Sequence, residues 1–416
     1  MTITAFINAR LIDPITGRDE LGSLLIEDAL IMDLGTDISI PKGVKTTDCK
    51  GYILSPGLID MESYATDGTS AAKGGITTSL LMPYFEPLIE NNISVEYIQH
   101  KTKTSEPIKY HVFGSATEGL EGTTMSELGR MAQSGALGFT DARKAIENTN
   151  LMRRILEYAS GEDLLILQHI EDPDLTGQGV ATEGETATRM GLPSAPLEAE
   201  VMMLDRDLRL LELTLTRYHA KTVTTEKAIN AIKEAKKSGK RVTCGTSPQY
   251  FSLNEKAIIE YRTFAKVSPP LRNEDDRLAV VQGIKDGTID VISSSHDPQS
   301  VDLKRLPFEQ AATGIVGYET LLPLALELHH SAGVDLITVL KTMTSNPAKI
   351  LGLETGQLKV GTPADLMVFN PSSPWRIKVD NFLSDNQNSP FDNRPVQGRV
   401  IETIVDGKTV YKRSGE

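Results

Sequence analysis

The sequence has few of the residues on which cysteine-based and membrane-spanning proteins depend. Only two cysteines occur in 416 residues, Cys49 and Cys244, and no C-x-x-C spacing is present. This excludes a cysteine zinc site and a disulfide framework, and it predicts that both thiols are small buried side chains in a reducing cytoplasm. No run of about 18 apolar residues occurs, so no membrane span is expected.

An excess of positive charge is lacking too. The chain has 43 Lys and Arg against 56 Asp and Glu, a formal net charge of −13, which argues against a nucleic-acid surface. It does not exclude an anionic small molecule, because a site can be locally positive in an acidic protein. The first residues, MTITAFINARLIDP, do not have the basic and apolar segments of a signal peptide. We therefore expect a cytoplasmic location.

Two β-rich ends flank a long middle segment. The first 55 residues alternate short apolar runs with Gly, Asp and Pro, and ETIVDGKTVYK near the other end predicts a hairpin with Asp406-Gly407 at its turn. Between them, short apolar runs alternate with helical patterns such as residues 148–161, for which Asn148 is the predicted N-cap and Gly161 the residue after the end. This alternation favours a (β/α)₈ barrel over a doubly wound sheet.

Several longer stretches resemble the dihydroorotases of the amidohydrolase superfamily. The resemblance covers nearly the whole chain, in order, and SPPLR and NSPF favour dihydroorotases over allantoinases and dihydropyrimidinases. The stretches are PGLID (56–60), GGITTSLLMP (74–83), GALGFTD (135–141), QHIED (168–172), SPPLRNEDDR (268–277), DGTIDVISS (286–294), GIVGYET (314–320), NPAKILGL (346–353), GTPADLMVFNP (361–371) and NSPFDNRPVQGRVIETIVDGKTVY (388–411).

The resemblance implies a fold and a chemistry. It predicts a barrel over residues 56–356 and a discontinuous β-sandwich domain over 1–55 plus 357–416. Members of the family bind one or two zinc ions at the barrel mouth, where the metal activates water and polarises the scissile amide of dihydroorotate. The reaction, which interconverts dihydroorotate and carbamoyl-aspartate, belongs to pyrimidine biosynthesis.

The resemblance also shows which metal positions have changed. The family's two histidines after PGLID correspond to Glu62 and Tyr64, and a later histidine corresponds to Thr222. The acidic ligand and a further histidine are kept as Asp141 and His169. The position of the aspartate that serves as ligand and general base holds Ser295, and a serine hydroxyl cannot take a proton from water near neutral pH.

The substrate-binding positions differ as well. The family's Arg and Asn, which hold the substrate carboxylate, correspond to Thr66 and Tyr84, and threonine cannot form the two-pronged contact of an arginine. The gap before GGITT is about a dozen residues shorter than in the family, which would remove much of the first barrel helix, roughly three turns. We expect this loss to leave the mouth altered or open.

Two hypotheses follow. The first is a catalytically inactive pseudoenzyme without a metal cofactor, which acts as a structural subunit in a homo-oligomer and with aspartate transcarbamoylase, as the resemblance to the family's degenerate members implies. The second is an active cyclic amidohydrolase in which Glu62, Asp141 and His169 hold one zinc.

Other interpretations of the surviving residues also stay open. Asp141 could cap a turn or pair with Arg143, and His169 could be a structural residue at a strand end. His296 is predicted to point away from the site of Ser295, since neighbouring strand residues face opposite sides. A Ser295–His169–Asp141 triad is conceivable, but the sequence has no G-x-S-x-G nucleophile elbow.

Overall fold

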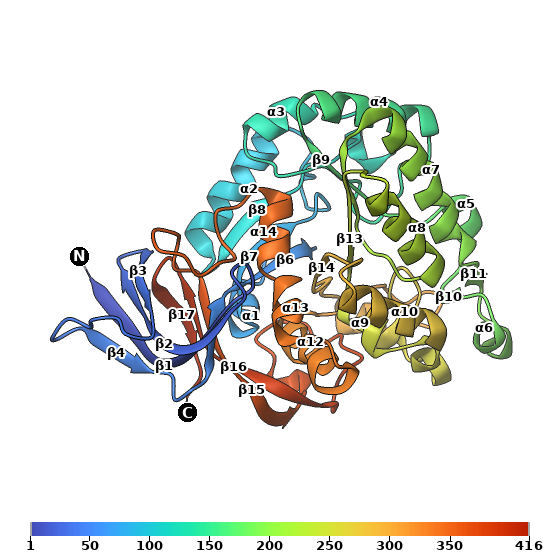
Figure 1. The fold of residues 1–416 in the computed structure, drawn as a ribbon. Helices are drawn as coiled ribbons and strands as arrows, with labels where there is room; N and C mark the ends of the chain where they lie inside the picture. Colours follow the sequence, from blue (N-terminus) through green and yellow to red (C-terminus); the bar gives the residue numbers. More distant parts are fainter. Residues whose placement is uncertain (1, 415–416) are drawn as a thin grey trace.

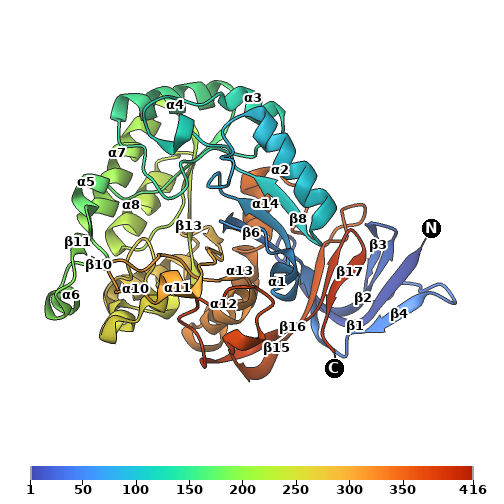
Figure 2. The same cartoon turned by 180° about the vertical axis from the view of Figure 1, so that it is seen from behind.

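The computed structural model describes residues 2–414, which form a parallel barrel and a β-sheet domain that holds both ends of the chain (Figure 1). The same arrangement seen from behind shows the strands of the two termini side by side in one sheet (Figure 2). No helix in the described part of the chain is long and apolar enough to cross a membrane.

The β-sheet domain is one hydrogen-bonded sheet of eight strands. Its central contact joins the two ends of the chain, because β5 pairs with β15 antiparallel and with β1 parallel. The order along the sheet is β17 (Lys408–Lys412), β16 (Pro395–Val405), β15 (Leu366–Arg376), β5 (Ile53–Pro56), β1 (Ile3–Asp13), β2 (Arg18–Glu27) and β3 (Leu30–Gly35), and β4 (Lys45–Asp48) pairs with β1. The bounds 1–55 and 357–416 stay a prediction, since strand pairing alone does not fix where the domain ends.

The predicted hairpin at the end of the chain is confirmed. β16 and β17 pair antiparallel, and the two residues between them, Asp406 and Gly407, have φ values of 46° and 73°. A two-residue turn with both φ angles positive matches the right-handed twist of the flanking strands, which explains the Asp-Gly pair at this point.

The barrel contains eight parallel positions. Seven are strands: β6 (Leu58–Ser63), β7 (Ile76–Leu81), β8 (Lys109–Val112), β9 (Leu165–Gln168), β12 (Arg217–Ala220), β13 (Val242–Thr246) and β14 (Val291–Ile292). The eighth lies at Phe139, which bridges Gly114 and Ile166, and a parallel bridge between Ser63 and His296 closes the ring. All residues of β6 and β7 are buried, as expected for parallel strands that are covered on both faces.

Helices surround the barrel. The larger ones are α1 (Gly68–Lys73), α2 (Asn92–Ser105), α3 (Leu128–Gln133), α4 (Thr149–Gly161), α7 (Glu198–Thr214), α8 (Glu226–Lys237), α10 (Glu274–Lys285), α12 (Tyr318–Ala332), α13 (Leu336–Lys341) and α14 (Ser345–Leu351). Small elements in the loops are α5 (Pro173–Thr176), α6 (Glu185–Met190), α9 (Pro248–Ser252), α11 (Val301–Lys304), β10 (Ala181–Thr182), β11 (Ser194–Ala195) and the 3₁₀ turns η1 (Glu118–Leu120), η2 (Glu255–Tyr261), η3 (Thr263–Ala265) and η4 (Val379–Asn381).

The local sequence explains where these helices begin. Asn148 caps α4 with a side chain that accepts from the backbone N–H groups of Asn150 and Leu151, as predicted. The predicted end of α4 is wrong by one residue, because Gly161 is its last residue and Glu162 follows as the C-cap. The first barrel helix, α1, has only six residues, which agrees with the short gap in the sequence.

Candidate functional site

The residues singled out in the sequence gather at the carboxyl ends of the barrel strands, where barrel enzymes place their chemistry. Glu62 lies near the end of β6, and the others follow a strand or the eighth position: Tyr64, Asp141, His169, Thr222 and Ser295. We call this end of the barrel the mouth. The fold brings the residues to one end, but the side chains form separate groups there.

Lys221, which the sequence reasoning missed, is the centre of the first group. Its ammonium nitrogen lies 2.9 Å from Glu62 Oε1, and it donates to the Tyr64 hydroxyl at 2.7 Å and to the Ala142 carbonyl at 2.8 Å. Three acceptors thus satisfy all three N–H donors of the ammonium. The Lys221 and Glu62 side chains are each only 5% exposed, so this ion pair is shielded from water.

The other atoms of this group complete the contacts of Glu62. The Tyr64 hydroxyl donates to Glu62 Oε1 at 3.1 Å, and the Thr222 hydroxyl donates to Glu62 Oε2 at 3.4 Å. Burial, and then the negative charge of Glu62, raises the pKa of the Tyr64 hydroxyl, so the phenol stays neutral and is a poor metal ligand. Both carboxylate oxygens of Glu62 are therefore engaged within the protein.

Asp141 belongs to a second group. One of its oxygens accepts from the backbone N–H groups of Ala116 and Thr117 at 3.1 and 2.9 Å, and the other accepts from the Thr117 hydroxyl. Burial raises the pKa of Asp141, although these hydrogen bonds act in the opposite direction. Asp141 thus fixes the loop after β8. The predicted pairing with Arg143 is wrong, because Arg143 forms its ion pair with Asp297, at 2.6 Å.

His169 belongs to a third group. Its Nε2 lies 3.2 Å from Glu171 Oε2, which also accepts from the Ser268 hydroxyl at 3.3 Å. Arg272 contacts the other oxygen of Glu171 at 3.2 Å. Burial on its own would raise the pKa of Glu171, but His169 and Arg272 hold it below its usual value. No contact joins His169 to Asp141 or Ser295 among the described residues, so a catalytic triad of these three is not assembled.

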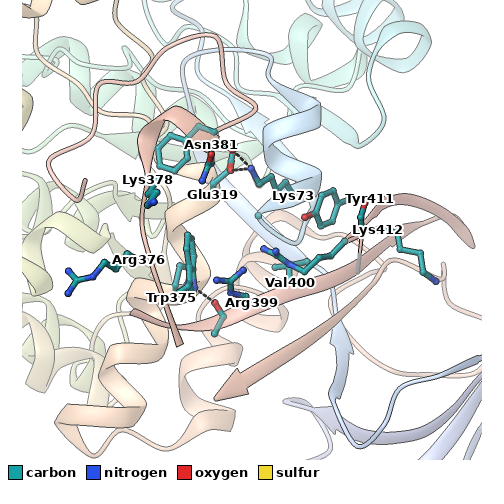
Figure 3. Close-up of a pocket in the computed structure, with 16 residues that line it drawn as sticks. Lys73, Glu319, Trp375, Arg376, Lys378, Asn381, Arg399, Val400, Tyr411 and Lys412 are labelled. Atoms are coloured by element: carbon teal, nitrogen blue, oxygen red, sulfur yellow. Dashed lines mark hydrogen bonds and ion pairs between the residues drawn. The ribbon is translucent and has the colours of Figure 1, made fainter. Parts of the chain in front are cut away.

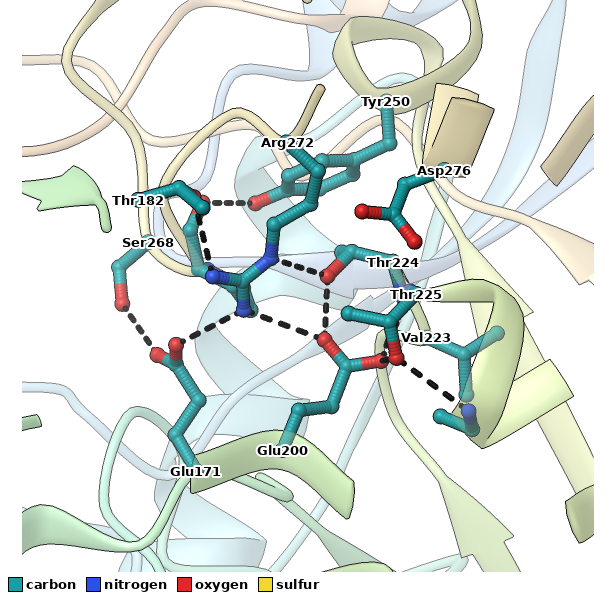
Figure 4. A network of polar contacts seen from close by, with 12 residues as sticks. Glu171, Thr182, Glu200, Val223, Thr224, Thr225, Tyr250, Ser268, Arg272 and Asp276 are labelled. Carbon is teal, nitrogen blue, oxygen red and sulfur yellow. Dashed lines mark hydrogen bonds and ion pairs between the residues drawn. The ribbon is translucent and has the colours of Figure 1, made fainter. Parts of the chain in front are cut away.

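The third group continues into a buried network around Arg272 (Figure 4). The guanidinium, 2% exposed, lies between the carboxylates of Glu171 and Glu200 and donates to the hydroxyls of Thr224 and Thr182. A buried charge is tolerated when it is paired and hydrogen-bonded, as here. The network connects the loops after β9, β12 and β13 and holds His169 and Glu171 in place.

Arg143 covers the mouth. Its guanidinium lies 4.2 Å from the ring centroid of Tyr64 and 4.9 Å from that of Tyr84, within the range of cation–π contacts. Thr66, the other predicted substrate position, is half-buried and forms no side-chain hydrogen bond in the described structure. The positive charge of Arg143 is already paired with Asp297, whose pKa burial raises and Arg143 lowers in part.

Ser295 and His296 face different surroundings, as predicted. Ser295 lines the mouth and has a φ of 52°, in the left-handed region, which explains how the chain turns at this point. His296 is fully buried, its ring is stacked on that of Tyr318 with centroids 3.8 Å apart, and its Nδ1 accepts from the Gly317 N–H. Burial lowers the pKa of His296 to about 3. It is therefore a neutral structural residue and cannot replace a base at position 295.

The centre of the mouth is nearly filled. The cavity among Glu62, Tyr64, Lys221 and Ser295 has a volume of about 30 Å³, far below the several hundred Å³ typical of a small-molecule site. Beside it, Arg143, His169, Glu171 and Ser268 line an open cleft of about 780 Å³. The expectation of an altered or open mouth is met in part, since its centre is closed and a cleft is open at its side. Lys221, Tyr64 and Arg143 line the central cavity.

The donor set does not fit a zinc ion. Among residues 2–414, no group of three or more His, Cys, Asp and Glu side chains is arranged to hold a metal ion. The Glu62 carboxylate pairs with the Lys221 ammonium, and the His169 ring lies against Glu171. The Asp141 carboxylate accepts a hydrogen bond from the backbone N–H of Thr117. Sequence reasoning could have suspected Lys221, because it adjoins the altered ligand position Thr222, but nothing in the sequence shows that its side chain turns toward Glu62. Both cysteines are free and buried, as predicted.

Comparison with known proteins agrees with the fold and the motifs. The amidohydrolase family model matches residues 61–410, which is most of the chain. The solved L-hydantoinase (dihydropyrimidinase) of Arthrobacter aurescens superposes with a TM-score of 0.89 at 23% identity, over 100% of this chain and 97% of that one, which supports the same barrel-plus-β-domain fold. The chain is thus a member of the amidohydrolase family.

Sequence relatives narrow the assignment. The dihydroorotase of Anaplasma phagocytophilum is 39% identical over 98% of this chain and 95% of its own length. The dihydroorotase of Geobacter metallireducens is 40% identical over 97% and 98%. At this identity and coverage the chain is dihydroorotase-like.

Proposed function

We propose that this dihydroorotase-like chain does not carry out zinc-dependent ring opening of dihydroorotate, and that it acts as a structural subunit. The observation that carries the proposal is the ammonium of Lys221, bonded to Glu62, Tyr64 and Ala142. A zinc ion on Glu62 would stand beside this like charge. Because the pair is shielded from water, neither the ammonium nor the carboxylate can move aside without leaving a buried charge unpaired.

The chemistry of the remaining positions supports the same proposal. Ring opening needs a base that takes a proton from water, and Ser295 offers only a hydroxyl. It also needs a cation that is free to hold the substrate carboxylate. Arg143 is the arginine at the mouth, but Asp297 and two aromatic rings already engage it.

A second candidate, an active dihydroorotase with a reduced site, rests on the similarity to proteins that bear this name. It would need Glu62, Asp141 and His169 to leave their present partners and converge on one zinc. That change would break a buried ion pair and the contacts of the Asp141 carboxylate with the loop after β8.

The first experiment is the zinc content per chain after a zinc soak and desalting, together with a dihydroorotate hydrolysis assay. We expect near-zero zinc and no metal-dependent turnover. One zinc per chain with turnover would support the second candidate. The variant Lys221→Met, with Lys359→Met at an exposed position as its matched control, shows whether the ammonium excludes the metal. Zinc bound by Lys221→Met, and not by Lys359→Met or the unaltered chain, would support the exclusion of the metal by the Lys221 ammonium.

The structural role also needs a partner. From the resemblance to degenerate family members we propose aspartate transcarbamoylase, and a homo-oligomer of this chain. Analytical ultracentrifugation of the purified chain, alone and mixed with aspartate transcarbamoylase from the same source, tests both points. Sedimentation of both proteins together at micromolar concentration would support the pairing, and separate boundaries would contradict it.

A further inference from the structure

A second concave site lies between the barrel and the β-sheet domain (Figure 3). Its volume is about 620 Å³, some twenty times that of the cavity at the mouth. The walls come from α1 and α12 of the barrel, from the three C-terminal strands β15, β16 and β17, and from the loop that follows β15. Clefts between domains are frequent places for small-molecule sites, and this volume falls in their usual range.

The lining of this pocket is strongly basic, in contrast to the chain as a whole. Six of its residues are Lys or Arg and only one, Glu319, is acidic, in a protein with a net charge of −13. The six are Lys73, Arg376, Lys378, Arg399, Lys412 and Arg413. Such a concentration of one sign of charge in a concave site attracts ligands of the opposite sign.

Only part of this charge is neutralised by neighbouring carboxylates. Lys73 pairs with Glu319 at 2.8 Å, and Lys412 pairs with Glu402 at 2.9 Å. Arg376, Lys378 and Arg413 form no ion pair with any carboxylate of residues 2–414. Arg376 donates to a backbone carbonyl, that of Asn393, at 3.0 Å, which orients its guanidinium without neutralising it.

One wall of the pocket is fixed by an aromatic ring. The Trp375 indole N–H donates to the Gly398 carbonyl at 2.8 Å, and the Arg399 guanidinium lies 5.2 Å from the Trp375 ring centroid. These contacts hold the indole of Trp375, on β15, against the neighbouring strand β16 (Figure 3). Three of the cationic residues, Arg376, Arg399 and Lys412, are therefore held on strands of one β-sheet.

We propose that this pocket binds a small phosphorylated molecule with two or more negative charges. Guanidinium groups match phosphate oxygens with paired, charge-assisted hydrogen bonds, and ammonium groups add compact positive charge. The size of the pocket suits a small molecule and is too small for a macromolecular surface. The proposal is independent of the proposed function, because none of these residues lies at the mouth.

The lining of the pocket contains an intrinsic fluorescent probe, Trp375. Trp375 is the only tryptophan in the chain, and it lines both this pocket and a neighbouring cleft that contains His330 and Arg394. Intrinsic tryptophan fluorescence of the full-length protein therefore reports on these two places, and variants of Arg376 and Lys378, which line this pocket and not the cleft, separate them. The experiment is a titration with inorganic pyrophosphate at low ionic strength. We expect a saturable change in emission that weakens as salt is added, since salt screens exposed charges. A titration without saturation at millimolar pyrophosphate would overturn the proposal.

Matched variants test the location. Arg376→Gln with Lys378→Gln removes two exposed cations of the pocket, and Lys101→Gln with Lys359→Gln removes two exposed cations elsewhere. We expect the first pair to weaken pyrophosphate binding about tenfold or more, and the control pair to leave it within about twofold. Equal weakening by both pairs would show nonspecific attraction and would contradict a built site.

A carboxylate ligand tests the chemical class. Citrate resembles pyrophosphate in charge but has no phosphate geometry. We expect it to bind at least about tenfold more weakly, because the site is proposed to recognise phosphate oxygens as well as charge. Citrate that binds as tightly as pyrophosphate would overturn the assignment to phosphorylated molecules.

Discussion

The mouth of the barrel and the pocket between the two regions both contain cationic side chains, but these have different partners. At the mouth, Lys221 and Arg143 are paired with carboxylates, and the central cavity that both line has a volume of about 30 Å³. In the pocket, Arg376 and Lys378 are exposed and belong to the lining of a cavity of about 620 Å³. A cation with a full set of protein partners stabilises the fold, whereas a cation with few of them is available to a ligand. The pocket that we propose as a ligand site therefore lies away from the end of the barrel at which this fold places its chemistry.

The largest change in the free energy of unfolding is expected when the ion pair at the mouth is broken. Lys221→Met leaves the Glu62 carboxylate buried without its cation, and we expect it to lower the free energy of unfolding by about 3–5 kcal/mol. Urea denaturation followed by circular dichroism measures this. The double variant Glu62→Gln with Lys221→Met is expected to recover part of the loss, because it leaves no unpaired charge. A double variant that is no more stable than Lys221→Met alone would contradict a role of charge pairing.

The next effect is a loss of stability in acid. Burial lowers the pKa values of His219 and His296 to about 3 from an ordinary value of 6.5. Below pH 6.5 the unfolded chain binds these protons and the folded chain does not, so stability is present above pH 6.5 and is lost as the pH falls toward 3. At pH 5 each histidine is expected to cost about 2 kcal/mol.

The contribution of a single buried histidine to the loss of stability in acid can be measured with a variant of His219. Denaturation of His219→Gln at pH 7 and pH 5 is expected to show a smaller difference between the two pH values than the unaltered chain does. The variant Lys378→Gln, at an exposed position in the pocket, serves as a control and should keep the full difference. An unchanged pH dependence in His219→Gln would contradict a neutral buried histidine.

A smaller effect concerns the outer contact of Glu62. Thr222→Val removes the hydroxyl that donates to Glu62 Oε2 at 3.4 Å and keeps the shape of the side chain. We expect a loss of about 1 kcal/mol, the usual contribution of one hydrogen bond, since the ion pair with Lys221 remains. Urea denaturation checks it, and a loss as large as that of Lys221→Met would mean that Thr222 has a greater role than its geometry indicates.

The smallest effect is expected in the pocket. Lys378→Met, the same chemical change as Lys221→Met, should alter the free energy of unfolding by less than about 0.5 kcal/mol, because its ammonium is exposed and has no carboxylate partner among residues 2–414. Measured side by side, the two Lys→Met variants show whether the contrast between mouth and pocket holds. A large loss for Lys378→Met would mean that its cation stabilises the fold.

The fold could be predicted largely from the sequence, because its signals are local. Strand–helix alternation predicts the barrel, Asp406-Gly407 predicts the hairpin, and the short gap after PGLID predicts a shortened first helix, which the structure shows as α1. The changes at Tyr64, Thr222 and Ser295 are also visible in the sequence, once the resemblance gives their positions. The ends of helices are predicted less well than the helices themselves. Gly161 is the last residue of α4 and not the residue after it, because a helix end depends on a difference of one hydrogen bond.

The candidate site could be predicted only in part, because its contacts join residues far apart in the chain. Lys221 meets Glu62 across 159 positions, and Arg143 pairs with Asp297 although Asp141 is nearer in sequence. The basic pocket draws on residues from Lys73 to Arg413. The sequence by itself determined the elements and which residues stand at the positions that the resemblance indicates, since periodicity and residue identity are properties of the chain. Only the tertiary structure decided which charges meet, since electrostatic pairing depends on distance in space and on burial.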